Sequence, residues 1–303
     1  MNPVVDKIKE KTGLDLVHIL SEKLSGTELN SLLLAVFDEK VRNATPASLL
    51  QQYGVNRFVQ PAEGDPVQLR TNELSCLTLL RSLGFEPLDL SPVSLLGSCS
   101  IVGTVDQKKV ISATRGTEVM ADATNAMALH AAYLQKTAGA SLHPMKFCTT
   151  HRHVRTPPPA VKGFTAHFKI ACWASAGKDR GALGFERQAL TEHLLALREV
   201  LSGVFSCDLK YIKLQPRTGY PSASTLIPVL VETLEQHFIV KVDEHAAPND
   251  YYRGVQFKAV IQPSDQEIEI ADGGFVDWTQ QMLGNRKERF LITGLGIEYL
   301  SKL

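Results

Sequence analysis

The sequence lacks an excess of charge of either sign. Its 303 residues contain 32 Lys and Arg against 32 Asp and Glu, so the formal net charge is zero. Proteins that bind nucleic acid through the phosphate backbone use a basic excess to displace counterions. The charge balance gives no support for a tRNA partner, and we do not expect one.

Cysteine is scarce and long apolar runs are missing. The chain has no Cys-x-x-Cys, and its five cysteines form an odd, widely spaced set: Cys76, Cys99, Cys148, Cys172 and Cys207. This pattern argues against a disulfide framework. No stretch of about 18 apolar residues occurs, and the first residues lack the apolar segment of a secretory leader. We therefore expect a cytoplasmic protein with no membrane contact.

What is present is an ordinary globular composition, with 44% hydrophobic and 21% charged residues. The first 60 residues read as helices. Ser25 stands three residues before Glu28 as in a capping box, and the apolar stripe that follows is expected to pack: Leu29, Leu32, Leu33, Val36 and Phe37. Residues 60–66, QPAEGDP, read as a linker. The sequence thus predicts a helical N-terminal region over 1–66 and a core domain over 67–303.

The core shows hairpins and long strands mixed with helices. Helices are expected over 72–85, 122–137, 185–204 and 224–238, and extended segments over 86–98, 108–116, 145–155, 164–177, 207–215, 238–245, 252–262 and 288–294. Strands 145–155 and 164–177 form a long hairpin. Because strands and helices do not alternate strictly, the pattern favours an α+β fold with an antiparallel sheet over a doubly wound parallel one.

Four stretches in the core occur in a telling order: LRSLGFEPLDLSP (80–92), THRHVRTP (150–157), NDYYRGVQF (249–257) and LITGLGIEYL (291–300). Together they resemble the catalytic core of class II aminoacyl-tRNA synthetases. The resemblance is strongest to the histidyl branch, which includes the regulatory subunit of ATP phosphoribosyltransferase, and it spans roughly residues 67–303. It implies an antiparallel sheet flanked by helices and, through the first stretch, a homodimer.

The resemblance also implies roles for individual residues. SATRGTE keeps Gly116 and Thr117 of a turn near the substrate amine, with Arg115 where the family has an acid. Arg152 stands where the family's arginine holds the ATP α-phosphate, which suits a planar guanidinium.

The pocket loop is the most specific match. Asp250, Tyr251 and Tyr252 resemble the loop that lines the amino-acid pocket, and we expect the two adjacent rings to point to opposite faces. The remaining residues that the resemblance assigns to the ligand are glycines: Gly273, Gly274, Gly294 and Gly296.

Several positive groups of the family are missing. The resemblance calls for an arginine at each of three positions that hold Ala247, Phe275 and Tyr299, and Val154 replaces a glutamate. Adenylate formation places negative charge on phosphates and needs positive groups aimed at it. We therefore do not expect ordinary amino-acid activation, and no catalytic residue is assigned. Positive charge could still come from new positions, where the candidates are Arg115, Arg155, Lys178 and Arg180.

Three functions remain open. The first is a synthetase-like paralogue without an anticodon domain, which binds a small anionic or amino-acid-like ligand and has a regulatory or assembly role, with a protein partner besides its own second copy. The second is an ATP-dependent ligase that activates a carboxylate for an acceptor other than tRNA, in which case ATP and Mg²⁺ are the cofactors. The third is an interaction module whose pocket has decayed.

Other polar residues have simpler interpretations. Along strand 145–155, Cys148 and Arg152 share one face while His151 and His153 lie on the other, so a C-x-x-H-x-H metal site is not expected. His193 is expected at the surface. Trp173 and Trp278 are expected to be packing residues.

Overall fold

The protein is described by a computed structural model that covers residues 2–138, 144–157, 165–221 and 223–303. Within these residues an eight-stranded sheet has the order β1-β4-β5-β10-β9-β8-β6-β7. Its strands are β1 (Glu86–Pro87), β4 (Met145–Val154), β5 (His167–Lys178), β6 (Leu209–Pro216), β7 (Val240–Val242), β8 (Arg253–Ile261), β9 (Ile268–Val276) and β10 (Glu288–Leu295). A second, two-stranded sheet pairs β2 (Val93–Leu95) with β3 (Thr117–Val119).

The six inner strands are antiparallel, and the two short edge strands are parallel to their neighbours. β4 pairs with β5 over their whole length, and β10 pairs with both β5 and β9. β1 runs parallel to β4, and β7 runs parallel to β6. The expected α+β fold with an antiparallel sheet flanked by helices is confirmed, and the sheet is mixed only at its two edges.

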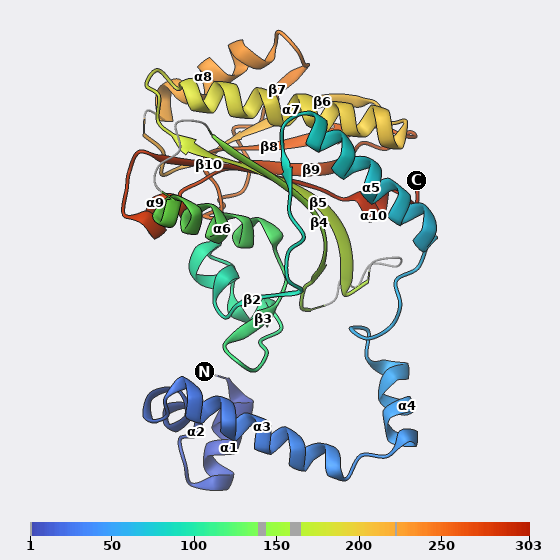
Figure 1. Cartoon of the computed structure of the whole chain (residues 1–303), viewed down its shortest axis with the longest axis vertical. Helices are drawn as coiled ribbons and strands as arrows, with labels where there is room; N and C mark the ends of the chain where they lie inside the picture. The colour runs from blue at the N-terminus through green and yellow to red at the C-terminus, as the bar shows by residue number, and fades with distance from the viewer. Residues whose placement is uncertain (1, 139–143, 158–164, 222) are drawn as a thin grey trace.

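Helices cover both faces of the large sheet (Figure 1). One face is packed by α5 (Pro66–Ser82), α7 (Gly184–Phe205), α8 (Ala223–Leu234) and α10 (Ile297–Leu300), whose buried residues form the larger hydrophobic core. The other face carries α6 (Ala123–Ala138) and α9 (Trp278–Leu283), which share a second core with the sheet. We call these the α7 face and the α6 face.

Helix α7 illustrates why the sequence folds this way. Its apolar residues recur at three- and four-residue spacing, so Leu190, Leu194, Leu197 and Leu201 lie on one side and are all fully buried. Such a stripe drives a helix onto a sheet because each buried leucine removes apolar surface from water, which is worth about 1.5–3 kcal/mol per side chain.

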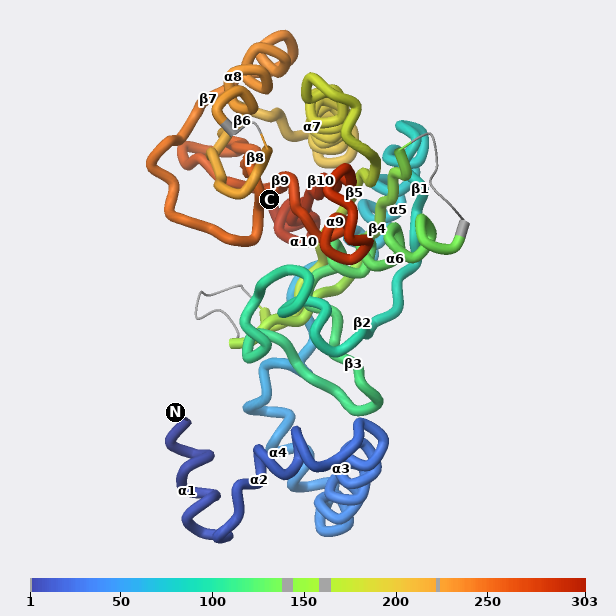
Figure 2. Tube along the Cα trace, turned by 90° about the vertical axis from the view of Figure 1, so that its left-hand side faces the viewer, coloured from blue at the N-terminus to red at the C-terminus, as the bar shows by residue number. Residues whose placement is uncertain are grey.

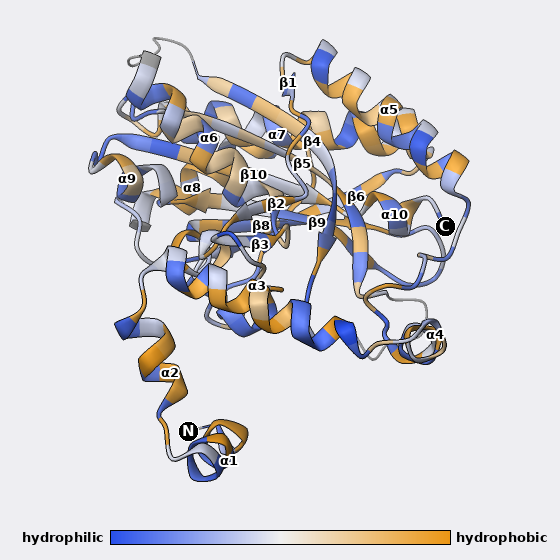
Figure 3. Ribbon diagram, turned by 60° about the horizontal axis from the view of Figure 1, so that its bottom comes forward, coloured by the Kyte–Doolittle hydropathy of each residue, from blue (hydrophilic) through white to orange (hydrophobic). Residues whose placement is uncertain are grey.

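The N-terminal helices are α1 (Pro3–Thr12), α2 (Leu16–His18), α3 (Gly26–Arg42) and α4 (Pro46–Val55). The expected capping box of Ser25 and Glu28 is formed. None of the residues 2–65 is buried, and the helices gather at one end of the molecule (Figure 2), where α3 contacts the rest of the chain through Asn30 and the amide of Arg115. The expectation that the α3 stripe packs is therefore wrong, since Leu32 and Phe37 are 42% and 53% exposed. Apolar residues also run along α2 and α4 (Figure 3).

Three other expectations are corrected. Helix α5 begins at Pro66 rather than at residue 72, because Asp65 caps it by accepting hydrogen bonds from the amides of Val67 and Gln68. The strand expected over 108–116 is instead mostly irregular, and β3 follows it. Strand β9 was not expected at all. The domain boundary at residue 66 stays a prediction.

His193 is buried, not at the surface, because both ring nitrogens find hydroxyl partners in the α7-face core. Nε2 lies 2.9 Å from Ser175 Oγ and Nδ1 lies 2.8 Å from Thr293 Oγ1. Trp173 and Trp278 are both buried in the two cores. Among the described residues no helix is both long and apolar enough to cross a bilayer. The cytoplasmic location stays a prediction.

Candidate functional site

Polar side chains from four segments meet on the α6 face of the sheet. Asp122 and Thr124 come from the start of α6, the two tyrosines from the loop before β8, Asp272 from β9, and Arg155 from just beyond the end of β4. We call Asp122, Thr124, Arg155, Tyr251, Tyr252 and Asp272 the tyrosine cluster.

Tyr251 is held by the first turn of α6. Its hydroxyl donates to Asp122 Oδ2 at 2.5 Å and lies 3.3 Å from Thr124 Oγ1. Asp122 Oδ1 also accepts hydrogen bonds from the amide and hydroxyl of Thr124, at 2.9 and 2.6 Å. The Tyr251 ring packs edge-on against Trp278, with ring centroids 5.2 Å apart. The carboxylate of Asp122 thus fixes both the hydroxyl of Tyr251 and the helix end.

Tyr252 is held by a carboxylate of β9, as Tyr251 is held by one at the start of α6. Its hydroxyl donates to Asp272 Oδ2 at 2.9 Å, and the amide nitrogen of Gln256 approaches the same oxygen at 3.3 Å. The rings of Tyr251 and Tyr252 are in edge contact, with centroids 4.8 Å apart. Both belong to the α6-face core. The expectation that they point to opposite faces is wrong, because strand alternation begins only at Arg253, where β8 starts.

Arg155 supplies the positive charge of the cluster. Its Nε donates to the carbonyl of Ala121 at 3.0 Å, and its guanidinium lies 5.6 Å from the ring centroid of Phe168. Loss of solvation acts to lower the pKa of Arg155, but the charges of Asp122 and Asp272 outweigh it, so the pKa is raised. The resemblance did not assign Arg155 to the ligand, and the sequence offered it only as one of several cations that could replace the missing arginines.

Burial also shifts the pKa values of the two tyrosines and of Asp272. It raises the pKa of Tyr251 and of Tyr252 well above their usual range, and the neighbouring Asp122 and Asp272 carboxylates add to this, so both hydroxyls stay protonated. Loss of solvation raises the pKa of Asp272, against the hydrogen bond from Tyr252 and the charge of Arg155.

Among the residues of the tyrosine cluster, Arg155 and Asp272 are exposed. A guanidinium and a carboxylate that reach water are open to a charged ligand from solvent, and each can form charge-assisted hydrogen bonds with it.

The two glycines of β9 have a packing role. A Cβ at Gly274 would come within 2.4 Å of the carbonyl of Val255 and 2.8 Å of the Tyr252 ring. At Gly273 it would come within 2.2 Å of the carbonyl of Ile292. Only glycine lets the neighbouring strands and the Tyr252 ring approach this closely.

Arg152 lies on the α7 face, away from the tyrosine cluster. It pairs with Lys169 on β5, next to Ala171 and Trp173 of the α7-face core. Its NH1 lies 2.9 Å from His167 Nδ1 and 3.2 Å from Glu298 Oε2 of α10. The expected alternation along β4 is confirmed, since His153 points to the α6 face and accepts a hydrogen bond from the amide of Ala123.

Arg115 and Thr117 are also away from the cluster. Arg115 precedes β3, and its amide donates to Asn30 Oδ1 of α3 at 2.7 Å. The hydroxyl of Thr117 donates a hydrogen bond to the carbonyl of Thr114. The acid and threonine that reach Tyr251 are instead Asp122 and Thr124. The signal was in the sequence: they have the acid-x-Thr spacing of the Glu-Gly-Thr turn that the resemblance implies.

Of the other expected residues, Asp250 and Gly294 lie near the cluster, whereas Gly296 lies at the start of α10 on the α7 face. The side chain of Asp250 is exposed, while its carbonyl accepts a hydrogen bond from Arg253. Gly294 is paired with Asp272 across β10 and β9, so it borders the cluster, and a Cβ there would have ordinary contacts of 3.8 Å or more. Gly296 begins α10.

The cluster can bind both signs of charge. Two carboxylates can accept from an ammonium group, the guanidinium of Arg155 can pair with a carboxylate, and three hydroxyls can orient either. Among the described residues no group of three His, Cys, Asp or Glu side chains is placed to hold a metal ion. The arrangement therefore suits a small zwitterion, such as an amino acid.

No family model matches the chain, and no curated protein matches it in sequence. Solved structures do match. The chain is similar to an ATP phosphoribosyltransferase regulatory subunit/histidyl-tRNA synthetase from Bacillus halodurans, with 13% identity, a TM-score of 0.59 and coverage of 80% of each chain. It is similar to apo histidyl-tRNA synthetase from S. aureus, with 11% identity, a TM-score of 0.63 and coverage of 81% of this chain and 68% of that one.

A third similar structure is a histidine–tRNA ligase subunit from Alicyclobacillus acidocaldarius, with 13% identity, a TM-score of 0.57 and coverage of 80% of this chain and 94% of that one. At such identities the likeness concerns the fold. The core therefore has the class II synthetase-like fold, and the fold that the resemblance in the sequence implied is confirmed.

Proposed function

We propose that this chain, which has the fold of the class II aminoacyl-tRNA synthetase core, is a synthetase-like paralogue that binds a small amino-acid-like ligand at the tyrosine cluster. Its role is regulatory or in assembly. The observation that carries the proposal is the pair of tyrosine hydroxyls bonded to Asp122 and Asp272, with Arg155 bonded to the carbonyl of Ala121 beside Asp122. Carboxylates and a guanidinium on one face of the sheet match the ammonium and carboxylate of an amino acid.

The binding proposal is tested by titrating the full chain with L-histidine and the other proteinogenic amino acids while following thermal unfolding. A ligand that binds only the folded state stabilises it by about 2.7 kcal/mol when present at 100 times its Kd. We expect one amino acid to raise Tm progressively with its concentration, as a ligand selective for the folded state must. If none does, the proposal fails.

Arg155 and Arg152 provide a matched pair of variants, because they are three residues apart and on opposite faces of the sheet. Arg155→Gln removes the positive charge of the cluster and should abolish the Tm response. Arg152→Gln removes the same charge from the α7 face and should leave the response intact. A response that is lost only in Arg152→Gln would move the ligand to the other face.

The alternative function, an ATP-dependent ligase that forms an adenylate from a carboxylate, needs several positive groups near the phosphates. Arg152 engages Glu298 on the other face. This leaves Arg155 as the guanidinium of the tyrosine cluster, and no observation favours the ligase. Amino-acid-dependent exchange of pyrophosphate into ATP would support it over the binding role.

We propose a homodimer as the working assembly. Helix α5, which the resemblance assigns to the dimer interface, leaves Val67 and Leu74 73% and 68% exposed. The two side chains are seven residues apart and therefore lie on one side of the helix. Apolar side chains at this spacing are typical of a helix that packs against a partner.

A further inference from the structure

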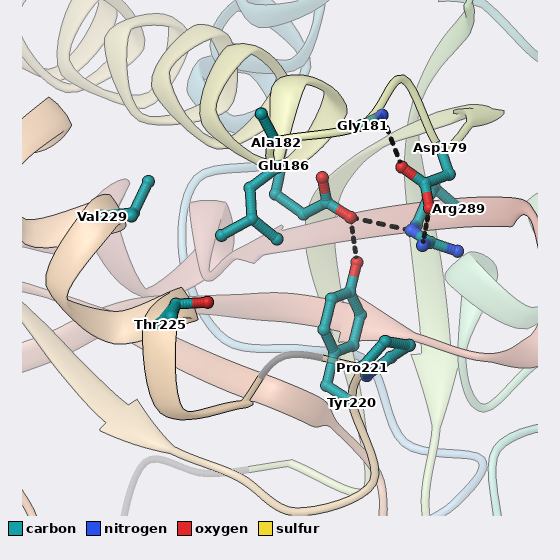
Figure 4. Close-up of a pocket in the computed structure, with 10 residues that line it drawn as sticks. Asp179, Gly181, Ala182, Glu186, Tyr220, Pro221, Thr225, Val229 and Arg289 are labelled. Carbon is teal, nitrogen blue, oxygen red and sulfur yellow. Dashed lines mark hydrogen bonds and ion pairs between the residues drawn. The ribbon is translucent and has the colours of Figure 1, made fainter.

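A cavity of 320 Å³ lies on the α7 face, between the start of α7, α8 and Arg289 near the start of β10. It is separate from the tyrosine cluster, which is on the α6 face. Charged groups gather on one side of it, from Asp179, Glu186 and Arg289, with Tyr220 below them (Figure 4). We call it the α7–α8 cavity.

The guanidinium of Arg289 is committed to the protein. Its Nε donates to Glu186 Oε1 at 2.7 Å and its NH2 to Asp179 Oδ2 at 2.8 Å, while NH1 donates to the carbonyls of Arg286 and Glu288. The side chain is 5% exposed. Arg289 therefore organises the two carboxylates and is held away from an incoming anion.

Among the described residues, Glu186 uses only one of its two carboxylate oxygens as a hydrogen-bond acceptor. It is 1% exposed, and its Oε1 accepts from both Arg289 and the hydroxyl of Tyr220. Its other oxygen, Oε2, has no hydrogen-bond partner among the described residues. A buried carboxylate oxygen without a donor is costly, so the site gains free energy from any ligand that brings one.

The charge balance indicates which donor is missing. Two carboxylates face one guanidinium, so the polar side of the cavity has an excess of one negative charge. Burial and the adjacent Glu186 raise the pKa of Tyr220 well above its usual range, so its hydroxyl stays a neutral donor to Glu186. A positively charged donor complements this group, and an anion does not.

The remaining wall of the cavity is largely apolar, and part of it has an unusual backbone conformation. Val229 lies across the cavity from the Arg289 group (Figure 4), and Leu183 also lines it. Ala182 and Leu183 both have positive φ, at 46° and 56°. Non-glycine residues in this region are strained and persist where the surrounding structure requires them, often at ligand sites.

We propose that the α7–α8 cavity binds a small organic cation, with a primary ammonium group at Glu186 Oε2 and a short aliphatic body against Leu183 and Val229. The cavity volume is at the low end of the range for ligand pockets, so the ligand has few heavy atoms.

The test uses the full chain and n-butylammonium chloride as the probe, with binding followed by ligand-observed NMR and calorimetry at constant ionic strength. Sodium butyrate and 1-butanol are the matched anionic and neutral probes. We expect saturable binding of n-butylammonium and none of the other two. Equal binding of 1-butanol or of butyrate would overturn the proposal, as would no binding of n-butylammonium.

Variants locate the binding. Glu186→Gln should weaken n-butylammonium at least about tenfold, because it removes a hydrogen bond to a charged group. Glu192→Gln carries the same change on the same helix outside the cavity and should bind like the wild type. Val229→Phe fills the apolar side of the cavity, keeps every charge and should also abolish binding. This variant tests the proposal even if Glu186→Gln does not fold. Undiminished binding by Val229→Phe would overturn the proposal.

Discussion

The buried histidine on α7 makes stability depend on pH in a way that one substitution can isolate. His193 is fully buried between two hydroxyl groups, and burial lowers its pKa to about 3 from the usual 6.5. The folded protein therefore holds His193 neutral throughout the mildly acidic range. The unfolded chain takes up a proton there as soon as the pH falls below 6.5.

The sign of the effect follows from this difference. Because the unfolded state binds more protons between pH 6.5 and 3, acid shifts the equilibrium toward unfolding. The contribution of His193 is fully present above pH 6.5 and is lost as the pH falls, by about 1.4 kcal/mol for each pH unit. Between pH 7 and pH 5 the loss is about 2 kcal/mol.

His193→Gln removes the titrating group and keeps a side chain that can bond Ser175 and Thr293. The variant should be less stable than the wild type at pH 8, since its fit is poorer. It should lose about 2 kcal/mol less stability than the wild type between pH 7 and pH 5. His153, whose pKa burial also lowers to about 3, contributes equally to both proteins and cancels.

Urea unfolding followed by tryptophan fluorescence is a suitable assay, because Trp173 lies 6.3 Å from the His193 ring. Curves at pH 8, 7, 6 and 5 give the free energy of unfolding of each protein. The gap between wild type and variant should narrow steadily toward pH 5. A constant gap would refute the reasoning and would mean that the buried imidazole becomes charged in the folded state.

Three further predictions concern packing, capping and assembly. Leu194→Ala, at a fully buried position, should lower the free energy of unfolding by about 2–5 kcal/mol, and a loss below 1 kcal/mol in urea unfolding would mean that α7 does not anchor the core. Asp65→Ala should cost about 1 kcal/mol by removing the cap of α5, and an unchanged Tm would show that the cap is dispensable. Leu74→Glu should convert a dimer to a monomer in light scattering, and an unchanged mass would place the interface elsewhere.

Much of the fold could be predicted where one periodicity dominates the sequence. The leucine spacing of α7 and the pairing of β4 with β5 follow directly from residue patterns. Strand β9 was not predicted because aspartate followed by two glycines, as in Asp272, Gly273 and Gly274, is more typical of a turn than of a strand. In the folded protein the two glycines are required by the close approach of β8 and β10, which only tertiary structure reveals.

The candidate site was harder to predict than the fold. Alternation along β4 correctly separated Arg152 from His153, but it does not tell which face carries the cluster. The same alternation places Arg155 with His153, yet nothing in the sequence distinguished Arg155 from the other cations as a site residue. The prediction that the α3 stripe packs was wrong for a related reason. Periodicity shows that a helix has an apolar side, but not what covers that side.

The position of β10 has a consequence for synthesis. This strand lies in the middle of the sheet, between β5 and β9, although it is made after both. A nascent chain that has not yet released residues 288–295 from the ribosome holds two half-sheets, each with a bare edge. Such edges invite pairing with other chains. We therefore expect the protein to fold after translation of β10 and to depend on chaperones until then.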